Sequence, residues 1–441
     1  MSRRNFILLI IVLTLVIAIT FGLWFFRQGG APGEEGTGGT NFISQFNPFG
    51  NGGGTKPPST TPPADISDYE PEDVVAWKLR KVSSMPIAGY TVYQKERLKE
   101  VPLPPAPVET VSTSTAPSTA KPTPPPTEFF PSLRYVARVD GNIYQTFADK
   151  IVERKFSTTV IPKVYEALFG PKGESVVMRY LNQDDRTIET FVGTLPKEVL
   201  GGDTAMENEV KGSFLPEGIQ DISLSGDTTS LFYLFESGES MIGTTLSFLT
   251  NKKAQVFDSA FTEWLSSWPN SKMVTLTTKP SASVPGYMYA LDPTAKNLSN
   301  VFGGINGLTT LTSPSGKLVL YADNNLSVGI YHTDTKVVDA LSIKTMPDKC
   351  LWGKLSDVLY CSVPKFVSSG GYPDLWYQGE ESFADQVWKI DIETGNATLL
   401  VNPSVVAGEE IDGIKLSTDE GENYLFFVNK KDSFLWELAL K

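Results

Sequence analysis

Residues Leu308–Val338 read LTTLTSPSGKLVLYADNNLSVGIYHTDTKVV. The stretch and the two residues after it contain four short runs of mostly apolar or β-branched residues: Leu308–Thr312, Leu318–Ala322, Ser327–His332 and Lys336–Ala340. Turn-forming sequences separate the runs, so the pattern predicts a four-stranded antiparallel meander. One such sheet cannot bury both of its faces alone, and similar sheets must pack against it. Four-stranded repeats of about 40 to 50 residues are typical of β-propeller blades.

Related runs recur along the chain and align on a candidate third strand. One column of this alignment holds a large apolar or aromatic residue in six repeats: Tyr144, Leu246, Tyr289, Tyr331, Trp388 and Trp436. A tight turn precedes each candidate second strand, for example GPKGE at Gly170–Glu174 and SPSGK at Ser313–Lys317. The repeat between Lys163 and Pro196 fits this pattern less well. The repeats together predict an all-β protein, a seven-bladed β-propeller over residues 74–441.

The last repeat stops after its third strand, at Lys441. A missing fourth strand would leave an open edge, and propellers commonly close by taking a strand from the other terminus. We therefore expect Ala76–Val82 to complete the final blade. Ile87–Gln94 and Leu133–Val139 should then be the first and second strands of blade one. Residues 101–131 are proline-rich and should form an extended, solvated insertion between these two strands.

The N-terminal region predicts a membrane anchor. Asn5–Phe26 is an apolar run long enough to span a bilayer as a helix, and Arg3 and Arg4 precede it. By the positive-inside tendency, the N-terminus should stay cytoplasmic and the propeller should be extracytoplasmic, on a single-pass protein of the cell membrane. A cleaved signal peptide is the alternative, but no small-x-small cleavage pattern follows the run. Residues 1–27 are thus a predicted transmembrane anchor, and the Gly/Pro/Thr-rich residues 28–73 a disordered linker.

Charge argues against nucleic acid as a partner. The chain has a formal net charge of −12, and Arg3, Arg4 and Arg27 belong to the anchor region, so the exported part is more acidic still. A surface this acidic repels phosphate backbones.

The inventory of reactive side chains predicts no catalytic residue, metal site or cofactor. His332 is the single histidine, which removes histidine triads and histidine-rich metal sites. Short carboxylate runs at Asp184-Asp185, Asp323 and Asp419-Glu420 fall at predicted hairpins, where aspartate favours the turn itself. No glycine-rich phosphate loop precedes a predicted helix.

Cys350 and Cys361 are the only cysteines, and they are symmetric about the turn in CLWGKLSDVLYC. This places them opposite one another on adjacent antiparallel strands, where a disulfide is possible in an exported protein. The alternative is two buried thiols that act as small apolar side chains.

The long loop Pro364–Asp385 of blade six carries the candidate partner-binding residues Tyr372, Asp374, Trp376 and Tyr377. Loops run over the surface, and tryptophan and tyrosine commonly anchor partners. The alternative is that these aromatics cover the blade edge or plug the mouth of the channel. We expect the connections Lys279–Gly286 and Pro196–Phe214 on the same face of the ring, pointing away from the membrane.

The turns SPSGK and GPKGE, followed by an apolar strand and then a strand ending in Asp-x-x-Thr/Gly, resemble the repeats of TolB-like and WD40-like propellers. The sequence LRYVARVDGNIYQTF also looks like a family of bacterial propellers with an N-terminal anchor. The resemblance implies the propeller fold and a scaffolding role. It implies no particular catalysed reaction. The leading hypothesis is a binding or scaffold module for a protein or envelope polymer. Alternatives are a structural subunit of an envelope complex and a carboxylate-dependent hydrolase or lyase.

Overall fold

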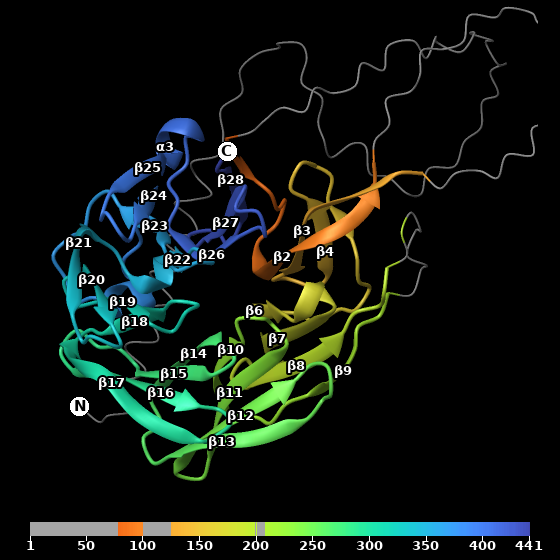
Figure 1. The fold of residues 1–441 in the computed structure, drawn as a ribbon. Coiled ribbons are helices and arrows are strands. Elements are labelled where there is room, and N and C mark those ends of the chain that lie inside the picture. The colour runs from red at the N-terminus through yellow and green to blue at the C-terminus, as the bar shows by residue number, and fades with distance from the viewer. Residues whose placement is uncertain (1–77, 100–124, 199, 201–207) are drawn as a thin grey trace, which may run out of the picture. The chain divides into compact units, whose positions relative to one another are not determined.

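The computed structural model describes residues 78–99, 125–198, 200 and 208–441, which form a ring of seven four-stranded antiparallel sheets (Figure 1). These residues belong to one compact unit, residues 72–441. The protein is therefore an all-β, seven-bladed β-propeller. In each blade the first strand lies toward the centre of the ring and the fourth lies at its periphery (Figure 1).

Blades one to three comprise the strands of residues 87–259. Blade one contains β2 (Ile87–Leu98), β3 (Thr127–Ala137), β4 (Ile143–Phe147) and β5 (Arg154–Lys155). Blade two contains β6 (Val164–Phe169), β7 (Ser175–Leu181), β8 (Ile188–Thr194) and β9 (Lys211–Phe214), with the 3₁₀ turn η2 (Pro171–Gly173). Blade three contains β10 (Ile219–Leu224), β11 (Ser230–Ser237), β12 (Ser240–Ser247) and β13 (Lys253–Ser259).

Blades four to seven comprise the remaining strands and three short helical turns. Blade four contains β14 (Trp264–Asn270), β15 (Met273–Thr278), β16 (Pro285–Asp292) and β17 (Asn297–Asn306). Blade five contains β18 (Thr309–Thr312), β19 (Leu318–Ala322), β20 (Ser327–His332) and β21 (Val338–Lys344). Blade six contains β22 (Cys350–Trp352), β23 (Val358–Pro364), β24 (Asp385–Asp391) and β25 (Ala397–Val401). Blade seven contains β26 (Gly413–Thr418), β27 (Tyr424–Asn429), β28 (Leu435–Ala439) and β1 (Leu79–Lys81). The turns are η3 (Pro347–Lys349), α2 (Asp374–Tyr377) and α3 (Pro403–Val406).

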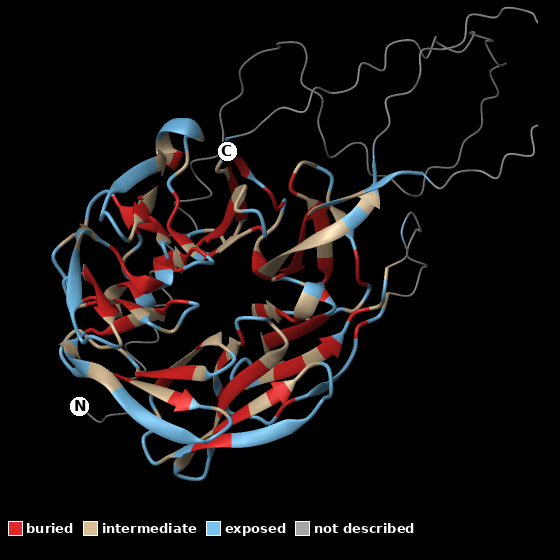
Figure 2. Ribbon diagram, in the orientation of Figure 1, coloured by how far each residue is buried: buried red, intermediate tan, exposed pale blue. Residues whose placement is uncertain are grey.

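The aligned column of large side chains predicted from the sequence lies on the third strands of six blades. Each of its residues is paired with a residue of the second strand in the same blade. Its cross-strand partners on the second strands are all fully buried: Tyr135, Leu231, Leu276, Val319, Cys361 and Phe427. The column marks the layer where neighbouring sheets pack. Burial is concentrated in the inner and middle strands, while much of the outer strands is exposed (Figure 2). Each fully buried large apolar side chain contributes roughly 1.5–3 kcal/mol.

The N-terminal strand closes the ring, as predicted. β1 pairs antiparallel with β28, with Leu79 opposite Leu438 and Lys81 opposite Trp436. The buried guanidinium of Arg80 donates to both carboxylate oxygens of Glu437, at 3.1 and 3.0 Å. It also donates to the carbonyl of Ala148 at 2.6 Å, so one side chain ties blade seven to blade one.

Strand direction defines two faces of the ring. Lys78 and Lys441 lie on one face, with the connections from first to second and from third to fourth strands, and we call it the terminal face. The opposite face carries the second-to-third connections and the links between blades, and we call it the loop face.

Two expectations about connections need correction. The strands around the proline-rich insertion are longer than expected, because Leu98 pairs with Thr127 and the segment 127–131 is part of β3. Arg97 stabilises this extension: its guanidinium pairs with Glu128 at 2.7 Å and lies 4.2 Å from the ring centroid of Phe130. Residues 101–124 lie outside the described part of the chain.

The second correction concerns the connection expected over Pro196–Phe214. β9 is the fourth strand of blade two, so the segment 195–210 joins the third and fourth strands. It therefore lies on the terminal face rather than the loop face. The short, exposed sequence KGSF of β9 has no hydrophobic alternation, and this hid the strand from sequence reasoning.

No helix among the described residues is long and apolar enough to cross a bilayer. The predicted anchor of residues 1–27 and the predicted linker of residues 28–73 fall outside the described residues.

Cys350 and Cys361 are directly opposite on β22 and β23, with a Cα–Cα distance of 4.1 Å, and their sulfurs are bonded. Both side chains are buried among Leu320, Trp352 and Ile390, between blades five and six.

We predict that this bond is formed in the purified protein. Iodoacetamide should then label neither cysteine of the denatured protein until a reductant is added, and both afterwards, as read by intact mass. Because the bond closes a short loop, replacing both cysteines with serine should lower the free energy of unfolding by about 2–3 kcal/mol. Full labelling without reductant would reject the bond.

Candidate functional site

The structure places the four candidate partner-binding residues on or beside α2, and two of the rings are inside the protein. Tyr372 and Trp376 are 2% and 4% exposed, and they pack in a cluster with Leu326 and Met346. Tyr377 is 40% exposed, and its hydroxyl donates to Asp348 at 3.0 Å. The burial agrees with the covering alternative. A partner contact through this loop stays a prediction, and Tyr377 has the ring surface to make one.

Asp374 and Trp376 attach the loop to other blades on the loop face. Asp374 accepts the backbone N–H of Ala282 in blade four at 2.9 Å. The indole N–H of Trp376 donates to Asp412, at the start of blade seven, at 3.0 Å. The carbonyl of Trp376 accepts Lys430 of blade seven at 2.7 Å. The loop from blade six therefore bridges blades four and seven.

The other polar candidates serve local structure. His332 pairs with Asp339 at 2.8 Å across neighbouring strands. The carboxylates of Asp184, Asp323 and Asp419 accept backbone N–H groups of their own turns. Within the described ranges, no group of three or more histidine, cysteine or acidic side chains is placed to hold a metal ion.

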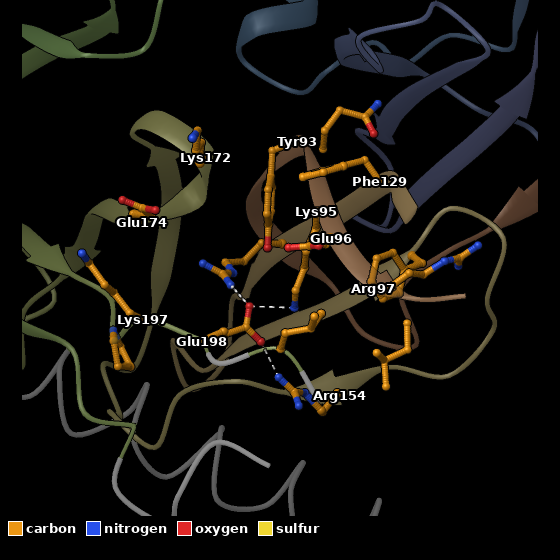
Figure 3. A pocket seen from close by; sticks show the side chains of 16 residues that line it. Tyr93, Lys95, Glu96, Arg97, Phe129, Arg154, Lys172, Glu174, Lys197 and Glu198 are labelled. Carbon is orange, nitrogen blue, oxygen red and sulfur yellow. Dashed lines mark hydrogen bonds and ion pairs between the residues drawn. The ribbon is translucent and has the colours of Figure 1, made fainter. Parts of the chain in front are cut away.

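A pocket of about 770 Å³ lies on the terminal face between blades one and two (Figure 3). Six basic residues and three acidic residues line it: Lys95, Arg97, Arg134, Arg154, Lys172, Lys197, Glu96, Glu174 and Glu198. Its basic character stands against the net charge of −12 of the whole chain. The pocket is thus a local concentration of positive charge on an acidic protein.

One face of the blade-one sheet supplies four of the six basic side chains. Side chains alternate along a strand, so Lys95 and Arg97 of β2 point to the same side. Across the sheet, Arg134 on β3 is directly opposite Gln145 on β4, which is directly opposite Arg154 on β5. The register fixes these groups in a row facing blade two. Like charges brought together in this way repel unless an anion lies between them.

The carboxylate of Glu198 fills that place (Figure 3). Its Oε2 atom lies 2.7 Å from the ammonium of Lys95 and 2.9 Å from the guanidinium of Arg134. Its Oε1 atom accepts the side-chain amide of Gln145 at 2.7 Å and a guanidinium N–H of Arg154. Two donors therefore reach each oxygen. We call Lys95, Arg134, Gln145 and Arg154 the carboxylate cage.

Burial and hydrogen bonding act in opposite directions on the cage. Burial raises the pKa of Glu198, hydrogen bonds from Lys95 and Gln145 lower it, and the net shift is downward. Burial lowers the pKa of Lys95, and its contact with Glu198 only partly offsets this. Glu198 is therefore held as a carboxylate at neutral pH.

Arg134 is the most buried member of the cage. Its side chain is 4% exposed, and its guanidinium lies 4.1 Å from the ring centroid of Phe156. It also donates to the carbonyl of Gly173 in blade two. By contrast, Lys172 and Lys197 are exposed at the rim and make no ion pair with another described residue. The pocket combines a floor that is mostly buried with two cations at its edge that have no ion-pair partner among the described residues.

Sequence reasoning missed this site because its members are dispersed over more than a hundred residues. The available signal was weak: alternate positions Tyr93, Lys95 and Arg97 share one face of a strand, which predicts a charged face but no pocket. Glu198 lies in a connection that was assigned to the wrong face of the ring.

No protein-family model matches the chain, and no curated protein matches its sequence. Solved structures similar to it include an oligogalacturonate lyase in complex with manganese, at 10% identity and a TM-score of 0.46. They also include the oligogalacturonate lyase of Vibrio parahaemolyticus, at 9% identity and a TM-score of 0.48. In both cases the match covers 70% of this chain and 86% of the other. Likeness at this level says nothing about what the present chain binds or catalyses.

Proposed function

We propose that this chain is a membrane-tethered, extracytoplasmic binding module whose propeller captures an acidic partner in the basic pocket of the terminal face. The observation that carries the proposal is the convergence of six basic side chains on one pocket of an acidic chain. A propeller fold alone hosts many functions, so the site must decide among them. Donors aligned by strand register, with rim cations that are unpaired among the described residues, suit the capture of an anionic group.

The predicted anchor and linker support the tethered part of the proposal. A flexible linker of residues 28–73 would span about 40 Å on average by the square-root rule for random coils. β1 begins on the terminal face, so the chain reaches the propeller on the same face as the pocket.

Charge reversal at the rim is expected to weaken capture. Lys172 and Lys197 are exposed and without ion-pair partners among the described residues, so the double variant Lys172→Glu/Lys197→Glu should fold normally. Its dissociation constant for a fluorescent hexaglutamate peptide should rise about tenfold or more at low salt, a loss of about 1.4 kcal/mol. The loss should shrink at high salt because the rim charges are screened. Fluorescence anisotropy measures both effects.

A matched control is Lys252→Glu/Lys253→Glu, which makes the same change of net charge where the connection between the third and fourth strands of blade three enters β13. That connection lies on the terminal face but outside the pocket. Equal loss in both double variants would mean that only net charge matters. Absence of binding by the wild-type protein would reject capture of an acidic partner.

A further inference from the structure

The donors around Glu198 match the geometry of one carboxylate. A carboxylate has two oxygens with about four lone-pair positions. The cage offers four donors, two to each oxygen, from four different side chains. A phosphate has further oxygens that would need donors of their own, and no other donor reaches Glu198 within the described residues.

The cage is built without any contribution from the connection that carries Glu198. Arg134, Gln145 and Arg154 are aligned by the strand register of blade one. Arg134 is additionally held by Gly173 and Phe156. Glu198 itself follows β8 on a connection of the terminal face, and its backbone belongs to no strand. Arg134 and Gln145, which are hydrogen-bonded to one another, would stay in place when Glu198 leaves, and the three cations would then lack an anion.

We infer that the cage is the recognition site for a carboxylate of the partner, and that Glu198 is an internal competitor that must be displaced before the partner's carboxylate binds. The inference rests on the proposed function and names the chemical group that the pocket recognises. It also gives Glu198 a regulatory role. Because the competent state of the pocket is the one without Glu198 in the cage, the apparent affinity is reduced by the fraction of molecules in which the cage is free.

The surroundings of the cage favour an acidic peptide segment over a sugar polymer. Leu98, Phe129 and Leu200 line the same pocket and are 43%, 69% and 44% exposed. Exposed apolar side chains beside cations suit a peptide that combines aspartate or glutamate with a large apolar residue. The partner is therefore expected to be a protein with such a segment.

The variant Glu198→Gln tests the inference because it keeps the shape of the side chain and removes its charge. It should bind the hexaglutamate peptide about tenfold more tightly than the wild-type protein, since a neutral amide competes poorly for three cations. A hexapeptide in which two glutamates are replaced with leucine should bind at least as tightly as hexaglutamate. Alginate and polyphosphate, as carboxylated sugar and phosphate probes, should bind more weakly per charge.

A second variant guards against loss of folding. Glu198→Asp keeps the charge but is one methylene shorter, so it cannot reach all four donors and should tighten binding by a smaller factor. In Glu198→Ala, acetate should raise the thermal midpoint more than chloride or phosphate does at equal ionic strength, because it can enter the empty cage.

The outcomes separate the inference from the proposed function. If wild-type protein binds the acidic peptide but folded Glu198→Gln binds it equally or more weakly, Glu198 is a structural counter-ion and the inference is wrong, while capture by the pocket stands. If phosphate rescues Glu198→Ala as well as acetate does, the cage is not selective for carboxylates. If no folded form binds any acidic probe, both proposals fail. Tighter binding of alginate than of the acidic peptides would replace the protein partner with a sugar polymer.

Discussion

A chain that begins at Ser83 is expected to lose cooperative folding, whereas a chain that begins at Glu72 should keep it. The shorter chain lacks β1, and the final blade then has three strands and an open edge. It loses the buried side chains of Leu79 and Val82, each worth roughly 1.5–3 kcal/mol. It also leaves the buried carboxylate of Glu437 without Arg80, at a cost of about 3–5 kcal/mol.

These losses together approach the whole stability of a typical domain, about 5–15 kcal/mol. Urea denaturation followed by tryptophan fluorescence should show a single steep transition for the longer chain and a shallow or absent one for the shorter. Size-exclusion chromatography should show association through the open edge. The point variant Arg80→Met, which keeps β1, should fall between the two. Equal denaturation midpoints for both chains would mean that the ring does not depend on this strand.

The second large effect is expected at a buried ion cluster that holds the loop of blade six. The ammonium of Lys349 is fully buried, lies 2.7 Å from Asp385 and contacts Asp412 directly. Asp412 also accepts the indole N–H of Trp376, so the cluster joins η3 to α2 and to blade seven. Replacing Lys349 with methionine leaves two buried carboxylates together without a cation. At pH 7.5 this should lower the free energy of unfolding by about 3–5 kcal/mol.

The pH dependence of this loss has a definite sign. Burial raises the pKa of Asp385 to about 6, against the opposing effect of Lys349. A raised pKa in the folded state means that the stability contributed by protonating Asp385 is present at low pH and is lost as the pH rises through about 6. Without Lys349 the carboxyl group of Asp385 should hold its proton more tightly still, because the ammonium that lowers its pKa is gone. The loss in free energy of unfolding caused by Lys349→Met should therefore be smaller at pH 5.5 than at pH 7.5.

The matched control is Lys431→Met, because Lys431 pairs with Glu410 on the same face of the ring with 30% and 65% of the two side chains exposed. An exposed pair of this kind contributes about 0–1 kcal/mol. Urea denaturation of residues 72–441 at both pH values measures both variants. A loss at Lys349 no larger than at Lys431, or a loss independent of pH, would show that the buried cluster does not stabilise the loop.

Much of the ring could be predicted from local patterns, and the functional surface could not. The Tyr/Trp column and the turns before the second strands located the blades, because each blade is built mainly from contacts between residues near in sequence. Blade two was the exception, since its fourth strand has no apolar alternation. The aromatics of the blade-six loop could be assigned from the sequence either to a partner or to covering the blade edge. Tyr372 and Trp376 are buried, because Asp374 and Asp412 tie the loop to blades four and seven.

The amino-acid sequence by itself determined the number of blades, the strand that closes the ring and the position of Cys350 opposite Cys361 on the neighbouring strand. Each of these follows from a short-range pattern, or from the count of strands in the last repeat, which lacks a fourth strand that the N-terminal segment can supply. Only the tertiary structure decided where charge converges. Lys95, Arg134, Arg154 and Glu198 come from separate segments, and their shared carboxylate cage exists because strand register and the packing of blade two against blade one bring them within hydrogen-bonding distance. Such long-range juxtaposition leaves no periodic trace in the chain.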